Sequence, residues 1–189
     1  MSITVERYEF PEITNDEWDS NWLIITGHAV LDGKSWSFRH PCLTTFELER
    51  LANWLDHVFL GKAENAYCGF TEPNLDFERL SELEVRIAFS LEALPPWCKR
   101  DGDFGEIGFN IPINDRLAVA ANSLRALLNR FPIRAQNSSY PLSVICNSTA
   151  RCQNLPLSVI PAKAGISESD SKLSCVISFS CDAACEELD

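Results

Sequence analysis

Residues 82–92, ELEVRIAFSLE, alternate between apolar and polar side chains, with Ala88 as the one exception. A strand of this kind faces a core on one side and water on the other, which is typical of antiparallel sheets. The core side carries Val85, Ile87, Phe89 and Leu91, and the water side carries Glu84, Arg86, Ser90 and Glu92. The strand ends before Pro95 and Pro96, because proline has no N–H to donate to a ladder.

Two further stretches have helical spacing. The first runs over residues 44–61, where Thr44 and Glu47 fit a capping box and Gly61 fits the position just past the last turn. Its buried stripe is Leu48, Leu51, Ala52, Leu55, Val58 and Phe59. The second begins with Asn114 or Asp115 as its cap and ends before Pro132. Its stripe is Leu117, Ala120, Ala121, Leu124, Leu127 and Leu128.

Strands fill the space around the two helices. Residues 21–31 are rich in β-branched side chains, and Asp32-Gly33 predicts a tight hairpin to a returning strand at 35–38. Residues 104–111 form another strand. Because strands and helices do not alternate regularly, we predict an α+β fold, an antiparallel sheet with two main helices packed on one face.

The composition changes near residue 135. All five tryptophans precede it, whereas residues 136–189 are rich in Ser, Asn and Cys and repeat PLSVI at 141–145 and 156–160. We therefore divide the chain into an α+β domain, residues 1–135, and a low-complexity, poorly structured tail, residues 136–189. Acquisition of the tail by read-through or insertion and a genuine disordered tail both fit this composition.

The net charge and the motifs of the sequence exclude several classes of function. The formal net charge of −11 disfavours nucleic-acid binding and favours a basic partner. No apolar run is long enough for a membrane span and the first residues do not resemble a signal peptide, so we expect a cytoplasmic protein. The eight cysteines and three histidines show no metal-ligand spacing, and we expect no metal and no cofactor.

The strongest catalytic hypothesis concerns residues 68–77, CGFTEPNLDF. Glu72 and Asp76 are candidates for the paired carboxylates of a small hydrolase. The alternative is a specific turn, because Pro73 favours extended backbone at Glu72 and Asn74 stabilises turns. A reactive Cys42 just before a helix cap is a weaker hypothesis, in which the helix amides lower the pKa of the thiol. We favour the turn and no catalysis.

Four stretches together resemble the WapI-type immunity proteins over about residues 5–135. They are YEFPEITNDEWDSNWLIITGHAVLDGKSWSFRHPCLTTFELERLANWL, FTEPNLDFE, FSLEALPPW and LAVAANSLRALLNRFPIR. The resemblance implies a bacterial cytoplasmic protein that binds and neutralises the C-terminal toxin domain of a cell-wall-associated polymorphic toxin. It also implies stoichiometric binding, often over a nuclease active site, and no catalytic residues. A nuclease is thus one candidate for the toxin.

An acidic inhibitor suits a basic nuclease cleft, so the candidate toxin contacts are acidic residues beside aromatic ones. One group is Glu72, Asp76 and Glu78, and the other is Asp16, Glu17 and Asp19 around Trp18. A generic protein-interaction module remains a further reading of the same features.

Overall fold

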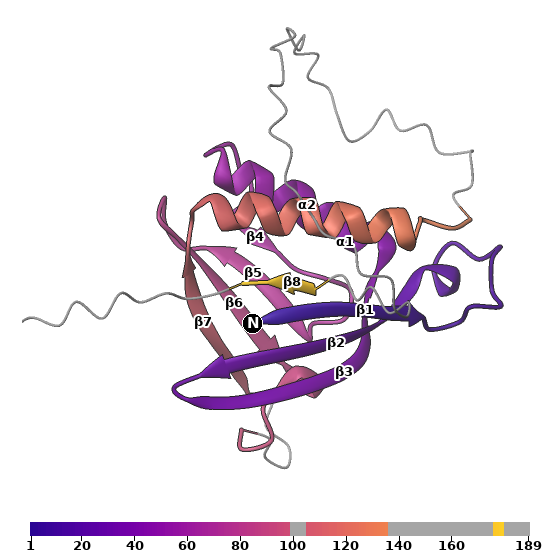
Figure 1. Ribbon diagram of the computed structural model, residues 1–189, viewed down its shortest axis with the longest axis horizontal. Coiled ribbons are helices and arrows are strands. Elements are labelled where there is room, and N and C mark those ends of the chain that lie inside the picture. The colour runs from indigo at the N-terminus through magenta and orange to yellow at the C-terminus, as the bar shows by residue number, and fades with distance from the viewer. Residues whose placement is uncertain (99–104, 136–175, 180–189) are drawn as a thin grey trace, which may run out of the picture. The chain divides into compact units, whose positions relative to one another are not determined.

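The computed structural model describes residues 1–98, 105–135 and 176–179 (Figure 1). These residues build two four-stranded antiparallel sheets and two main helices. The α+β class is confirmed, and its strands divide between two sheets. Residues 136–175 and 180–189, which include most of the predicted tail, lie outside the described residues.

Sheet A contains β1 (Ser2–Tyr8), β2 (Trp22–Leu31), β3 (Lys34–Thr44) and β8 (Val176–Ser178) in the order β3-β2-β1-β8. The hairpin between β2 and β3 turns at Asp32 and Gly33, which have φ of 50° and 73°. Both residues therefore lie in the left-handed region that a primed turn requires, and the predicted hairpin is confirmed. β3 is longer than the expected strand at 35–38 and reaches the cap of the first helix.

Sheet B contains β4 (Tyr67–Cys68), β5 (Leu75–Arg79), β6 (Glu84–Ser90) and β7 (Glu106–Pro112), hydrogen-bonded in chain order. The alternation of β6 is confirmed, because Val85, Ile87 and Phe89 are completely buried. The expected continuation to Glu92 is wrong. Leu91 has a φ of 51° and begins a short 3-10 helix, η2 (Leu91–Ala93).

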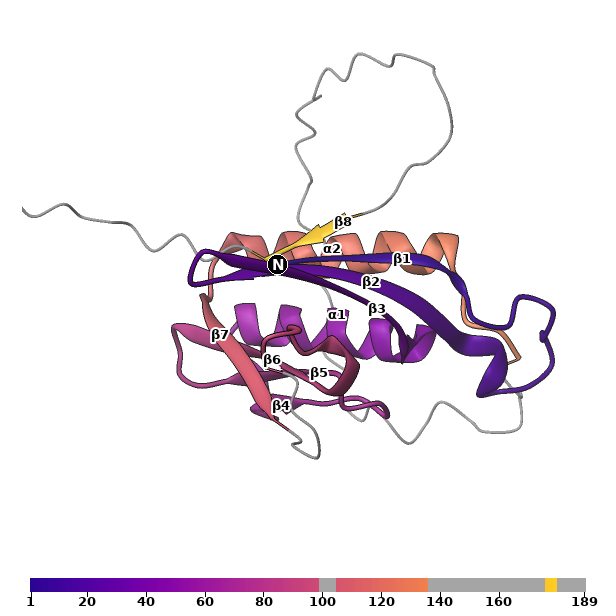
Figure 2. The same cartoon turned by 90° about the horizontal axis from the view of Figure 1, so that it is seen from below.

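The helices are α1 (Thr45–Phe59) and α2 (Asp115–Arg130). Thr44 and Glu47 form the predicted capping box of α1, and Asn114 caps α2 by accepting a hydrogen bond from the Arg116 N–H. Gly61 has a φ of 66°, as a residue just past a helix end requires. The helices pack against each other and lie side by side along one side of the strands (Figures 1 and 2).

One core lies between the sheets and beneath α1. Trp36 and Phe38 of β3 both meet the Phe89 ring of β6, with ring centroids 5.2 and 6.1 Å apart, and so join the two sheets. Trp54 joins α1 to sheet B through Phe77, at a centroid distance of 6.4 Å. Trp54 is buried, so it widens the core face of α1 beyond the stripe that the sequence predicts.

Two strands of sheet A, β1 and β8, were not predicted. β1 pairs with β2 and buries Ile3 and Val5. β8 pairs with the opposite edge of β1 and buries Ile177. β8 lies within residues 136–189, which were predicted to be a poorly structured tail. Three paired residues are too few to give a recognisable period.

Candidate functional site

The outer face of sheet B collects charged side chains from three strands. The register pairs Glu78 of β5 with Arg86 of β6, and Asp76 with Ala88. Glu106 of β7 lies at the end of the same face. Leu75 and Phe77 point into the core, so Asp76 and Glu78, at the alternate positions of the strand, point outward. We call Asp76, Glu78 and Glu106, with Arg86 and Tyr67, the acidic face.

Arg86 is the one cation among the residues of the acidic face. Its guanidinium forms an ion pair with Glu106, and this bond raises the pKa of Arg86. The Arg86 side chain can pass over β7 because residue 108 is glycine. A Cβ at this position would lie only 3.2 Å from the guanidinium and 2.7 Å from the Ile87 carbonyl oxygen. Arg86 thus neutralises Glu106 and leaves Asp76 and Glu78 as the negative part of the face.

Asp76 is held in a site that disfavours its charge. Burial raises the pKa of its carboxyl, and the Glu106 carboxylate raises it further, while Arg86 partly opposes the shift. Tyr67 stands beside it, 57% exposed, with a pKa raised by burial and then by the charge of Asp76. A carboxylate kept where folding opposes its ionisation is a feature of sites selected for binding or chemistry.

The raised pKa of Asp76 predicts a pH-dependent gain of stability in Asp76→Asn. The native state keeps this proton to a higher pH than the unfolded chain, so wild-type stability falls as pH rises above about 4. Asparagine cannot lose the proton. We expect a higher Tm for the variant at pH 7, with the difference shrinking towards pH 4, in thermal unfolding followed by circular dichroism. A Tm at pH 7 equal to or below that of wild type would contradict the description of this site.

Glu72 is not among the charged neighbours of Asp76. The charged neighbours that shift the pKa of Asp76 are Glu106, Arg86 and Glu78, whereas the Glu72 charge acts on the Cys42 thiol. The two carboxylates of the hydrolase hypothesis therefore act on different groups.

The segment around Glu72 is a structural turn. The N–H and hydroxyl of Thr71 donate to one Glu47 oxygen at 2.7 and 2.9 Å. Asn74 is fully buried and donates to Glu92 at 2.9 Å, and its carbonyl accepts the Ser90 N–H at 3.0 Å. These bonds attach the turn to the start of α1 and to the end of β6.

The second predicted group lies in the loop before β2, away from sheet B (Figures 1 and 2). Asp16 accepts hydrogen bonds from the N–H groups of Trp18 and Asp19, at 2.8 and 2.7 Å, and so shapes the loop. Trp18 is 52% exposed and its ring meets Phe46 edge-on. Glu17 and Asp19 are exposed. The structure therefore gives two separate acidic groups rather than one patch.

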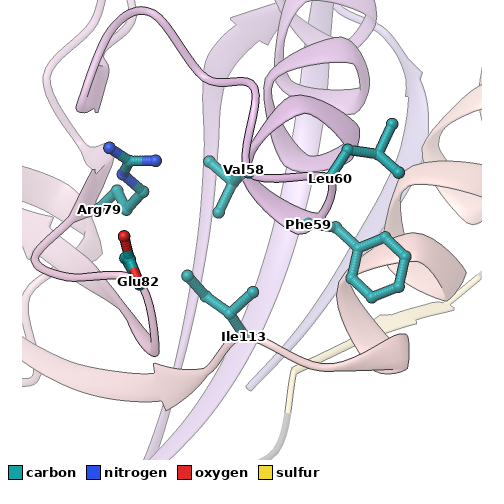
Figure 3. Close-up of a pocket in the computed structure, with 7 residues that line it drawn as sticks. Val58, Phe59, Leu60, Arg79, Glu82 and Ile113 are labelled. Atoms are coloured by element: carbon teal, nitrogen blue, oxygen red, sulfur yellow. The ribbon is translucent and has the colours of Figure 1, made fainter.

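A cavity of about 410 Å³ opens where α1 ends (Figure 3). It is lined by Val58, Phe59, Leu60, Gly61, Arg79, Glu82 and Ile113. A smaller hollow of about 230 Å³ lies beside the acidic face and is lined by Arg50, Trp54, Asn65, Tyr67, Cys68 and Gly69. Neither cavity includes a carboxylate of the hydrolase hypothesis.

The hypothesis of a reactive Cys42 is wrong. Cys42 is fully buried, and burial together with the Glu47 charge raises the pKa of its thiol to about 12. The helix amides that were expected to lower it are occupied by Thr44 and Glu47, as the capping box requires. Burial likewise raises the pKa of Cys68 to about 11.

Alkylation should therefore discriminate among the cysteines of the described part of the chain. In the native protein at pH 8, we expect iodoacetamide to modify Cys42 and Cys68 at least about 100-fold more slowly than Cys98, because only the thiolate reacts. Peptide mass mapping after short exposure measures this, and denaturation should equalise the rates. Rapid native modification of Cys42 would contradict the burial described here.

Within residues 1–98, 105–135 and 176–179, no three His, Cys, Asp or Glu side chains are arranged so that they could hold a metal ion. The helices of this part of the chain are too short or too polar to cross a membrane.

Of the acidic face, the sequence identified Asp76 and Glu78 and missed Glu106, Arg86 and Tyr67. The alternation within GEIGFN carries a signal, since Glu106, Gly108 and Asn110 fall on one side of that strand. The pairing that brings this side next to Asp76 is visible only in the structure.

Searches of curated proteins and of solved structures gave no match. The model of the Immunity protein WapI-like family matches residues 1–132, which contain both main helices and strands β1 to β7. The chain therefore belongs to the WapI-like immunity protein family.

Proposed function

We propose that this protein neutralises the C-terminal toxin domain of a cell-wall-associated polymorphic toxin by binding it stoichiometrically, without catalysis. The observation that carries the proposal is the family match over residues 1–132. The net charge of −11 supports a basic partner such as a nuclease. We place the encounter in the cytoplasm, where a toxin would reach its nucleic-acid substrate.

We propose the acidic face as the toxin contact. Asp76 and Glu78 point outward from a rigid sheet, and the exposed Tyr67 supplies an aromatic anchor of the kind enriched at protein interfaces. The cost of keeping Asp76 ionised is offset when basic toxin side chains approach it. Trp18 with Glu17 and Asp19 is the second candidate contact.

The test is co-expression with a toxin domain encoded immediately upstream of the gene for this chain. We expect growth to be restored and a complex to co-purify from the cells. An unrelated immunity protein serves as the negative control. Continued growth arrest, with both proteins present and folded but no complex between them, would refute the proposal.

A further inference from the structure

The edge of β1 that does not face β2 accepts a short strand. β2 pairs with one edge of β1 from Ser2 to Tyr8, whereas the other edge pairs with β8 at only three positions, Ser2 with Ser178, Ile3 with Ile177 and Thr4 with Val176. Beyond them, the Phe179 N–H donates to the Met1 carbonyl at 2.6 Å. Without β8 this edge would present unpaired N–H and C=O groups.

Two side chains of this segment are buried as deeply as the core. Ile177 and Phe179 are 0% and 3% exposed. The Phe179 ring lies 5.9 Å from the Phe77 ring of β5, and β8 also contacts α2. Alternate apolar side chains in fitted positions, with main-chain hydrogen bonds to an edge, are the two components of peptide recognition by strand addition.

The acceptor and the strand belong to different parts of the chain. β1, α2 and Phe77 lie within residues 1–132, which match the family, whereas β8 follows residues 136–175, outside the match. Residues 1–132 therefore provide the site, and a short segment far along the chain occupies it. A connection this long adds only a modest effective concentration, so the contacts of the segment itself must supply most of its binding. The same segment supplied in trans at sufficient concentration can therefore replace it.

We infer that the β1 edge, with Phe77 and α2, is a binding site for an extended peptide that carries large apolar side chains at alternate positions. The segment Val176–Phe179 is its intramolecular ligand. The site takes the same segment from a separate molecule in the same antiparallel register.

The test uses the full chain carrying Ile177→Asp and Phe179→Asp, which disfavours burial of the segment. Hydrogen exchange measured by mass spectrometry should show residues 1–8 exchanging at least about 10-fold faster than in wild type, while β6 stays protected. A synthetic peptide of residues 173–180, with serine in place of Cys175, should restore protection of residues 1–8. The same peptide with both aspartates should not.

Val119→Asp is the matched control, because Val119 is an apolar residue 62% exposed on α2. It should leave exchange of residues 1–8 unchanged. Unchanged exchange of these residues in the double variant, or failure of the apolar peptide to restore protection, would overturn the inference.

If the double variant also loses protection in β6, its fold is disturbed, and a second experiment tests whether the strand is exchangeable. A protease site inserted between residues 150 and 160 of the otherwise wild-type chain allows the connection to be cut after folding. We expect the C-terminal fragment to stay bound after gel filtration and to be displaced by excess apolar peptide. Immediate separation of the fragment, or its retention despite excess peptide, would contradict an exchangeable strand.

Discussion

Replacing Glu47 by alanine is expected to lower the free energy of unfolding by about 3 kcal/mol, the cost of removing one partner from a buried, charge-assisted network. Glu47 is 1% exposed. One carboxylate oxygen accepts the Thr44 N–H at 2.9 Å, and the other accepts the N–H and hydroxyl of Thr71 at 2.7 and 2.9 Å. Alanine leaves these donors without their acceptor and opens a void at the start of α1.

Urea unfolding followed by circular dichroism measures the effect. Glu49→Ala is the matched control, because Glu49 lies on the exposed side of the same turn and should change stability by less than about 0.5 kcal/mol. Glu47→Gln should fall between the two, because an amide can accept at only one end and presents an N–H₂ group to a donor at the other. Equal stabilities of Glu47→Ala and Glu49→Ala would refute this role.

Neutralising the acidic face is expected to weaken toxin binding by about 100-fold, within the range for charges at the centre of an interface. The variant is Asp76→Asn with Glu78→Gln, which keeps the ion pair between Arg86 and Glu106. The fold should remain intact, since Asp76→Asn alone removes a charge that folding disfavours. Isothermal titration calorimetry with the purified toxin domain measures the change in Kd.

The control for the acidic face is Glu12→Gln with Glu49→Gln, which changes the net charge equally at exposed positions elsewhere. Its effect on Kd should stay below about 5-fold and shrink with added salt. If both double variants weakened binding equally, net charge alone would explain the affinity. The acidic face would then not be the contact.

The elements that the sequence predicts well are those defined by local chemistry. Thr44 and Glu47 predict the start of α1 because a capping box involves only four consecutive residues. The Asp32-Gly33 turn is equally local. The division of the strands into two sheets is not local, because alternation shows which side of a strand is buried but not which strand lies next to it.

Glu47 shows most clearly how much of a residue's role can be predicted from the sequence. Its capping role is readable from sequence, whereas its bonds to Thr71 depend on the turn at 69–74 folding back onto α1. The same holds for the acidic face, which could be predicted only in part. Asp76 and Glu78 were identified from one strand, but Glu106 joins them only through the pairing of β6 with β7. Glu72 lies only four residues before Asp76, but its charge acts on the Cys42 thiol instead.

The most direct test of the central claim is titration of the activity of the purified cognate toxin domain with this protein. Stoichiometric neutralisation predicts a linear loss of activity that reaches its end at one protein per toxin and does not deepen with time. Complete inactivation by a small fraction of an equivalent, or undiminished toxin activity at a large excess, would contradict it.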